Sequence, residues 1–194
     1  MVGAPGSGKS YLGRTLSVAL GAELIQTDAV RKELFPDPRY TPAEAATVYA
    51  TCHRRIAAAL AAGCRVVFDG TNLREKRRRT LYQLAERAKA PVLVVVAYAS
   101  EATIRDRLRH RAAGGDPEDQ SDATWEIYLR MRRDTEPVPR PHVVVNTAVS
   151  PGPVIRLLER SLSGDLRVKS ESGETGAAAE SRVRYIALPP AHHR

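Results

Sequence analysis

Along residues 1–163, short apolar runs alternate with segments whose apolar residues recur at helical spacing. The runs predict strands, because a buried parallel strand reads as a short, nearly continuous apolar stretch. These strands are expected at 22–27, 65–69, 91–99 and 142–146. Helices are expected at 12–20, 30–35, 42–62, 74–88, 101–111, 122–134 and 154–162. Strands that alternate with helices predict an α/β domain, a three-layer sandwich with helices on both faces of a parallel sheet.

The pattern ends near residue 163. Residues 164–194 are rich in Gly, Ser, Ala and mixed charges, and such a stretch buries too little apolar surface to order itself. We therefore expect one domain at 1–163 and a disordered, low-complexity tail at 164–194. The short segment 183–188 leaves open a strand or a partner-binding motif within that tail.

Composition excludes several classes of protein. The longest apolar run, 91–99, is less than half of the roughly 20 residues that a membrane-spanning helix needs. No signal peptide opens the chain, and two cysteines cannot form a disulfide framework, so we expect a cytoplasmic protein that does not bind membranes. The net charge of +8 favours phosphate-bearing partners without separating nucleotides from nucleic acids.

The strongest motif is a glycine-rich loop, GAPGSGKS, which fits G-x-x-x-x-G-K-[ST]. Its glycines let backbone N–H groups surround phosphate oxygens, and the following helix directs its positive end at the same anion. The motif thus predicts ATP binding. Lys9 would contact the β- and γ-phosphates, and the Ser10 hydroxyl would bind Mg²⁺. The expected nucleotide-binding residues of the loop are Gly3, Pro5, Gly6, Ser7, Gly8, Lys9 and Ser10.

Such a loop normally follows a buried strand, yet only Met1 and Val2 precede Gly3. Loss of a central strand would leave both its neighbours unpaired. The first strand is therefore expected to be largely missing from this chain. We favour a start upstream of Met1 over a compromised protein.

Asp28 follows the second apolar run, where the carboxyl end of a strand opens toward ligands in α/β folds. It is a candidate general base for an attacking hydroxyl group. Arg31, one helical turn later, is a candidate for holding an anionic part of the acceptor. The alternative is an Asp that caps a helix and an Arg that is merely solvated.

Asp69 ends the apolar run 66–69, an arrangement that places Mg²⁺ or its water ligands in P-loop proteins. The basic run 74–79 follows it. This run either binds acceptor phosphates or is a solvated helix face, and we favour the solvated face for most of its side chains.

Arg107 and Arg111 share one face of a short helix beside the Gly114-Gly115 break. Two arginines next to such a break suit a lid, at about 101–134, that closes over ATP and neutralises the charge of the transition state.

Together these motifs resemble P-loop kinases of the polynucleotide 5′-hydroxyl kinase, zeta-toxin and chloramphenicol-phosphotransferase type. The segments that carry the resemblance are GAPGSGKS, Asp28-x-x-Arg31, DGTNLREKRRR, and RLRHR followed by SDATWEIY. The chain also resembles the ATP-binding half that is fused to aminoglycoside-phosphotransferase-like domains, which leaves the acceptor open.

The resemblance implies a Mg·ATP-dependent kinase that acts on a hydroxyl group. Lys9, Asp28 and Arg111 would be catalytic, Arg107 would bind the nucleotide, and Arg31 and Asn72 would bind the acceptor. Ser10 and Asp69 would hold the metal. A small molecule is slightly favoured over a polynucleotide 5′ end as acceptor. An ATP-dependent regulator without an acceptor and an inactive truncated kinase stay open as alternatives.

Overall fold

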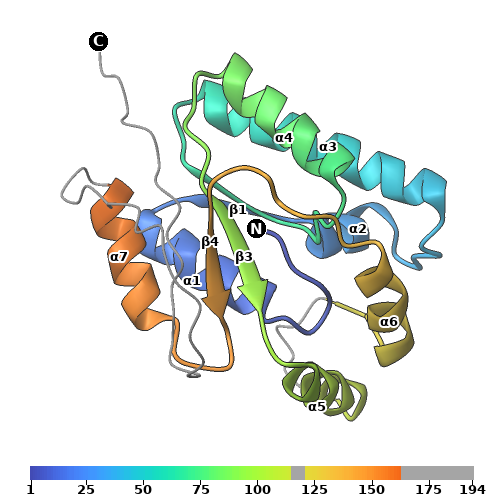
Figure 1. The fold of residues 1–194 in the computed structure, drawn as a ribbon. Helices are drawn as coiled ribbons and strands as arrows, with labels where there is room; N and C mark the ends of the chain where they lie inside the picture. Colours follow the sequence, from blue (N-terminus) through green and yellow to red (C-terminus); the bar gives the residue numbers. More distant parts are fainter. Residues whose placement is uncertain (115–120, 163–194) are drawn as a thin grey trace.

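The computed structural model describes residues 1–114 and 121–162, with side chains as far as residue 160. Among these residues the structure contains four strands, and helices lie around them (Figure 1). The strands are β1 (Glu23–Gln26), β2 (Val66–Asp69), β3 (Val94–Tyr98) and β4 (His142–Asn146). The helices are α1 (Lys9–Leu20), α2 (Thr27–Leu34), α3 (Pro42–Ala61), α4 (Glu75–Arg87), α5 (Glu101–Ala112), α6 (Trp125–Arg133) and α7 (Gly152–Leu162).

The strands form two parallel pairs, β1 with β2 and β3 with β4. The N-terminal residues lie between the pairs, in the middle of the fold (Figure 1). Val2 exchanges backbone hydrogen bonds of 2.8 Å with Val95 and Ala97, and the Met1 amine donates to the carbonyl oxygen of Phe68 at 2.9 Å. The expected central strand is therefore represented by one isolated bridge, between Val2 and Val96.

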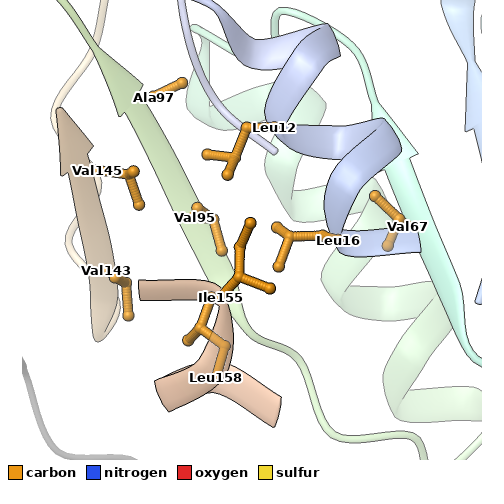
Figure 2. Packing of buried hydrophobic residues seen from close by; sticks show 9 residues of the cluster. All are labelled: Leu12, Leu16, Val67, Val95, Ala97, Val143, Val145, Ile155 and Leu158. Atoms are coloured by element: carbon orange, nitrogen blue, oxygen red, sulfur yellow. The ribbon is translucent and has the colours of Figure 1, made fainter. Parts of the chain in front are cut away.

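One face of this layer is covered by α1 and α7. Leu12 and Leu16 of α1 point toward Val95 and Ala97 of β3, and Leu158 of α7 completes the cluster (Figure 2). Leu12 is fully buried, so the helix that follows the glycine loop is anchored to the strands along its apolar stripe. Packing of α1 fixes the loop at the strands' carboxyl ends.

The opposite face is covered by α3 and α4. Val48, Cys52 and Ile56 of α3 pack with Ile25 of β1 and Phe68 of β2. Burying both faces confirms the expected three-layer α/β sandwich. Cys52 is buried, and neither cysteine is in a disulfide.

Helix signals explain where several elements begin. The Thr41 hydroxyl accepts a hydrogen bond from the N–H of Glu44 at 3.2 Å, and Pro42 takes the first helical position of α3. Ser100 caps α5 in the same way.

Several boundaries differ from the sequence pattern, including the start of α6 at Trp125 and not at residue 122. α2 begins at Thr27, directly after β1 ends at Gln26, whereas the sequence pattern placed its start at residue 30. The expected strand at 91–99 starts only at Val94. The tail at 164–194 lies outside the described residues. Within the described part of the chain, no helix is long and apolar enough to cross a bilayer.

Candidate active site

The glycine-rich loop forms a cradle that ends at the N-terminus of α1. Gly6 and Gly8 have φ angles of 76° and 79°, which favour glycine. A Cβ atom at Gly8 would lie 2.7 Å from Oγ1 of Thr147, and one at Gly6 would lie 2.9 Å from Cγ2 of Ile104. No side chain caps α1, and its first turn has no acidic residue. The cradle therefore fits an anion at the positive end of the helix.

Lys9 and Asp69 form the centre of the site. The Lys9 ammonium lies 2.6 Å from Oδ1 of Asp69, and both side chains are buried. Gln26 donates to Oδ2 of the same carboxylate at 3.0 Å. The carboxylate and the neighbouring Ser10 hydroxyl are oxygen ligands of the kind that Mg²⁺ prefers. The chemistry of these donors fits the metal that the motif implies.

Opposing effects act on the pKa of Asp69. Burial alone would raise it, but the charge of Lys9 and the hydrogen bonds from Lys9, Gln26 and Ser10 outweigh burial. The pKa of Asp69 therefore lies below its ordinary value, and the group is a carboxylate at neutral pH.

Asp28 lies in the first turn of α2, after the helix has begun at Thr27. The N-cap position belongs to Gln26, so the alternative of Asp28 as a helix cap is wrong. Burial raises the pKa of Asp28, although the charges of Lys9 and Arg31 and a hydrogen bond with Ser121 act to lower it. A raised pKa brings a carboxylate closer to the proton affinity that a general base needs.

Arg31 is buried, so the alternative of a solvated arginine is also wrong. Its Nη1 lies 3.6 Å from Oε2 of Glu44, and its guanidinium carbon lies 4.7 Å from the centre of the Tyr40 ring. Nε and Nη1 of Arg31 make no hydrogen bond among the described residues. Those donors are available to oxygen atoms of a ligand beside Asp28.

Arg107 contacts the loop directly. Its Nη1 lies 3.2 Å from the Gly6 carbonyl oxygen and 2.9 Å from Oγ1 of Thr147, and Nη2 lies 2.6 Å from the Thr147 carbonyl oxygen. The Thr147 hydroxyl donates to the Ser7 carbonyl oxygen at 2.6 Å. Arg107 therefore joins the cradle to the turn after β4.

Arg111 lies one helical turn beyond Arg107. Its Nη1 donates to the carbonyl oxygen of Ala123 at 3.3 Å, in the segment before α6. The catalytic role expected for Arg111 stays a prediction, as does the lid at 101–134, because residues 115–120 lie outside the described chain.

Two polar residues of the segment after Asp69 are buried and bonded to backbone carbonyl groups. Asn72 is 1% exposed, and its amide nitrogen donates to the carbonyl oxygens of Met1 and Gly70. Arg78, also 1% exposed, donates to the carbonyl oxygens of Leu73 and Pro137 at 2.7 and 2.5 Å. The structure thus does not group Asn72 with Asp28 and Arg31, and Arg78 of the basic run is neither solvated nor open to acceptor phosphates.

Sequence patterns missed several polar residues of the site. They are Gln26, Tyr40, Glu44, Ser121 and Thr147. The Thr41–Glu44 capping signal in the sequence predicts the position of Glu44 but not its contact with Arg31. The remaining contacts join elements far apart in the chain, which no local pattern encodes.

Comparisons with known proteins agree with the fold. A family model described as an AAA domain matches residues 1–138. The uncharacterized protein Rv2004c of Mycobacterium tuberculosis is 31% identical over an alignment of 141 residues that covers 66% of this chain and 27% of the relative. The chain therefore spans about a quarter of the length of the curated relatives it matches.

Solved structures with a similar fold include nucleotide complexes. Kti12 of Chaetomium thermophilum, in complex with ADP-AlF3, has a TM-score of 0.68 at 18% identity, with 84% of this chain and 96% of that chain covered. The APS kinase CysC of Mycobacterium tuberculosis, in complex with AMPPNP and APS, has a TM-score of 0.59 at 16% identity, with 84% and 94% covered. At these identities the likeness concerns the fold.

Proposed function

Because the chain belongs to the AAA domain family and has the fold of P-loop kinases, we propose that it is a Mg·ATP-dependent kinase that phosphorylates a hydroxyl group. The observation that carries this proposal is the position of Asp28. The carboxyl group of Asp28, partly buried in the first turn of α2, has a raised pKa and lies close enough to Lys9 and Asp69 for their charges to act on it. Hydrolysis alone does not need a carboxylate there, whereas transfer to an alcohol does.

In this proposal the acceptor hydroxyl lies beside Asp28. Its oxygen forms a bond to the γ-phosphorus while the bond from that phosphorus to the β,γ-bridging oxygen breaks, and ADP leaves. The hydroxyl proton passes to the Asp28 carboxylate. Arg31 holds oxygen atoms of the acceptor through the donors that make no hydrogen bond among the described residues.

The loop residues Gly3–Ser10 would hold the nucleotide, with Lys9 on the transferring phosphate. Lys9 reaches that phosphate by leaving Asp69, which then becomes available, with Ser10, to the metal. When bound, Mg²⁺ supplies charge that offsets the negative charge of the phosphates. Arg107 fixes the cradle through its contacts with Gly6 and Thr147, and we assign nucleotide binding to it and charge stabilisation to Arg111.

The test is a transfer screen with ATP labelled at the γ-phosphate. Hydroxylated metabolites and an oligonucleotide with a 5′ hydroxyl are offered as acceptors to wild type and to Lys9→Ala. The proposal expects label on an acceptor with wild type and none with Lys9→Ala. Label released only as inorganic phosphate would favour the alternative of an ATP-dependent regulator without an acceptor.

A further inference from the structure

The segment directly before α6 contacts the acceptor side of the site. Ser121 forms a hydrogen bond with Asp28. Asp122 contacts the Tyr40 hydroxyl through Oδ2, and its Oδ1 lies 3.7 Å from Nζ of Lys32. We name Tyr40, Lys32 and Asp122 the acceptor bridge, because their contacts join α2 and the α2–α3 connection to the segment directly before α6.

The fold holds Tyr40 in an uncommon conformation. Its φ angle is 55°, in the left-handed region that residues other than glycine seldom adopt. The Glu44 carboxylate accepts hydrogen bonds from the N–H groups of Arg39 at 3.0 Å and Tyr40 at 2.7 Å, and it also faces Arg31. Such backbone strain persists only where surrounding contacts enforce it, and it concentrates at ligand clamps. Glu44 therefore positions Tyr40 and Arg31 together.

Several cations on this side face carboxylates or are buried. Arg31 faces Glu44, and Lys32 faces Asp122. On the neighbouring helix, Arg74 lies 2.7 Å from Asp134, and Arg78 is buried. A polynucleotide gains affinity by neutralising several phosphates with exposed cations. Cations that already face carboxylates offer it little.

The groups beside Asp28 suit neutral hydroxyls instead. The hydroxyls of Tyr40 and Ser121 and the carboxylates of Asp122 and Glu44 accept or share protons from alcohols. Nε and Nη1 of Arg31, which make no hydrogen bond among the described residues although Nη1 faces Glu44, match alcohol oxygens. A compact acceptor with several hydroxyl groups can donate to these hydroxyls and carboxylates and can accept from the Arg31 donors.

This inference rests on the kinase activity proposed above. We propose that the acceptor bridge is the outer wall of the acceptor site, and that it limits the acceptor to a single sugar-sized polyhydroxylated molecule and excludes polynucleotide ends. Tyr40 is then the residue that determines specificity by size.

The experiment measures label transfer from ATP to monosaccharides and sugar acids, to their disaccharide counterparts, and to a short oligodeoxythymidylate with a 5′ hydroxyl. Wild type should label members of the first group and leave the oligonucleotide unlabelled. Tyr40→Ala should raise the disaccharide-to-monosaccharide ratio of kcat/KM by about tenfold or more, because the site loses its outer wall. Tyr40→Phe, which keeps the ring, and Asp122→Asn should raise that ratio less and leave the KM for ATP unchanged.

Two variants serve as matched controls. Tyr11→Ala removes an exposed tyrosine from α1, and Glu33→Gln breaks an exposed ion pair on α2 with Arg55. Both should keep the wild-type ratio. A ratio that is unchanged in Tyr40→Ala, Tyr40→Phe and Asp122→Asn would overturn the proposal.

A binding measurement distinguishes failure of the acceptor bridge as a size limit from failure of the proposed kinase activity. Fluorescence anisotropy of the oligonucleotide, labelled at its 3′ end, should show no saturable binding at low salt in the presence of ADP. Saturable binding, or transfer confined to the oligonucleotide, contradicts the proposal that the acceptor bridge excludes polynucleotide ends. It leaves the proposed kinase activity unaffected. Absence of transfer to every acceptor while ATP still binds contradicts the proposed function itself, and with it the wall.

Discussion

The ammonium of Lys9 lies 2.6 Å from Oδ1 of Asp69, so the lysine of the glycine-rich loop is held by the carboxylate that ends β2. One buried ion pair thus joins the residue expected on the phosphates to the residue expected at the metal. The charge of Lys9 helps to keep the pKa of Asp69 below its ordinary value.

Lys9→Ala should lose ATP turnover by about a hundredfold or more, because the phosphates lose a preorganised cation. It should also lose about 3 kcal/mol of unfolding free energy at pH 7, since Asp69 becomes a buried charge without its partner. Arg55→Ala, which breaks an exposed pair with Glu33, should cost less than about 1 kcal/mol. Urea unfolding measures both changes.

The stability loss in Lys9→Ala should depend on pH. In wild type the lowered pKa of Asp69 contributes stability that is present above the unfolded-state value of about 4 and is lost as the pH falls through the folded-state value. Without Lys9, burial raises that pKa, so Asp69 takes up a proton more readily. The difference between the two proteins should shrink from pH 7 toward pH about 4. A constant difference across that range contradicts the ion-pair account.

The raised pKa of Asp28 should set the acid limb of the rate profile. Transfer needs the carboxylate, so kcat/KM should fall as the pH drops through a value above that of a free aspartate. Ser121→Ala removes a hydrogen bond that lowers this pKa and should move the limb to higher pH. An acid limb that stays in place or moves to lower pH would contradict the role of Ser121 in lowering the pKa of Asp28.

Arg107 and Arg111 should separate nucleotide binding from catalysis. Arg107→Ala should weaken binding of a non-hydrolysable ATP analogue by about tenfold or more, because the cradle loses its link to Thr147. Arg107→Lys should not restore it, since an ammonium cannot span the two Thr147 oxygens and Gly6. Arg111→Ala should lower kcat with little change in affinity. Calorimetry and initial rates distinguish these outcomes, and the reverse pattern would exchange the two roles.

Arg78 should stabilise the fold rather than bind an acceptor. Arg78→Ala leaves the carbonyl groups of Leu73 and Pro137 without their donor and should cost about 2 kcal/mol or more. Arg79→Ala, at an exposed position on the same helix, should cost less than about 0.5 kcal/mol. Equal thermal shifts for the two variants would contradict the assignment.

The order of strands and helices was predictable from the sequence, because each element buries an apolar stripe or run. Val67 and Val95 illustrate this, since both lie in runs that are apolar throughout and both are buried. The glycine-rich loop was predictable as well, because phosphate binding requires glycines, a lysine and a hydroxyl residue at this fixed spacing. The start of α2 was not, since Thr27 ends an apolar run and opens a helix at once.

The acceptor side was only partly predictable. Asp28 and Arg31 follow from their spacing after a strand, but the contacts of Arg31 with Glu44 and Tyr40 depend on how α3 packs against α2. The burial of Arg78 depends on Pro137, which is 59 residues away. The basic run 74–79 alone cannot show which of its arginines is buried against a distant carbonyl group.

The most direct test of the central claim is a single-turnover transfer assay of Asp28→Asn on whichever acceptor the screen identifies. The amide keeps the size of the side chain but takes up no proton. The account predicts that transfer falls by about a hundredfold or more, while the affinity for a non-hydrolysable ATP analogue stays near that of wild type. Transfer at the wild-type rate by a folded Asp28→Asn protein would contradict the account.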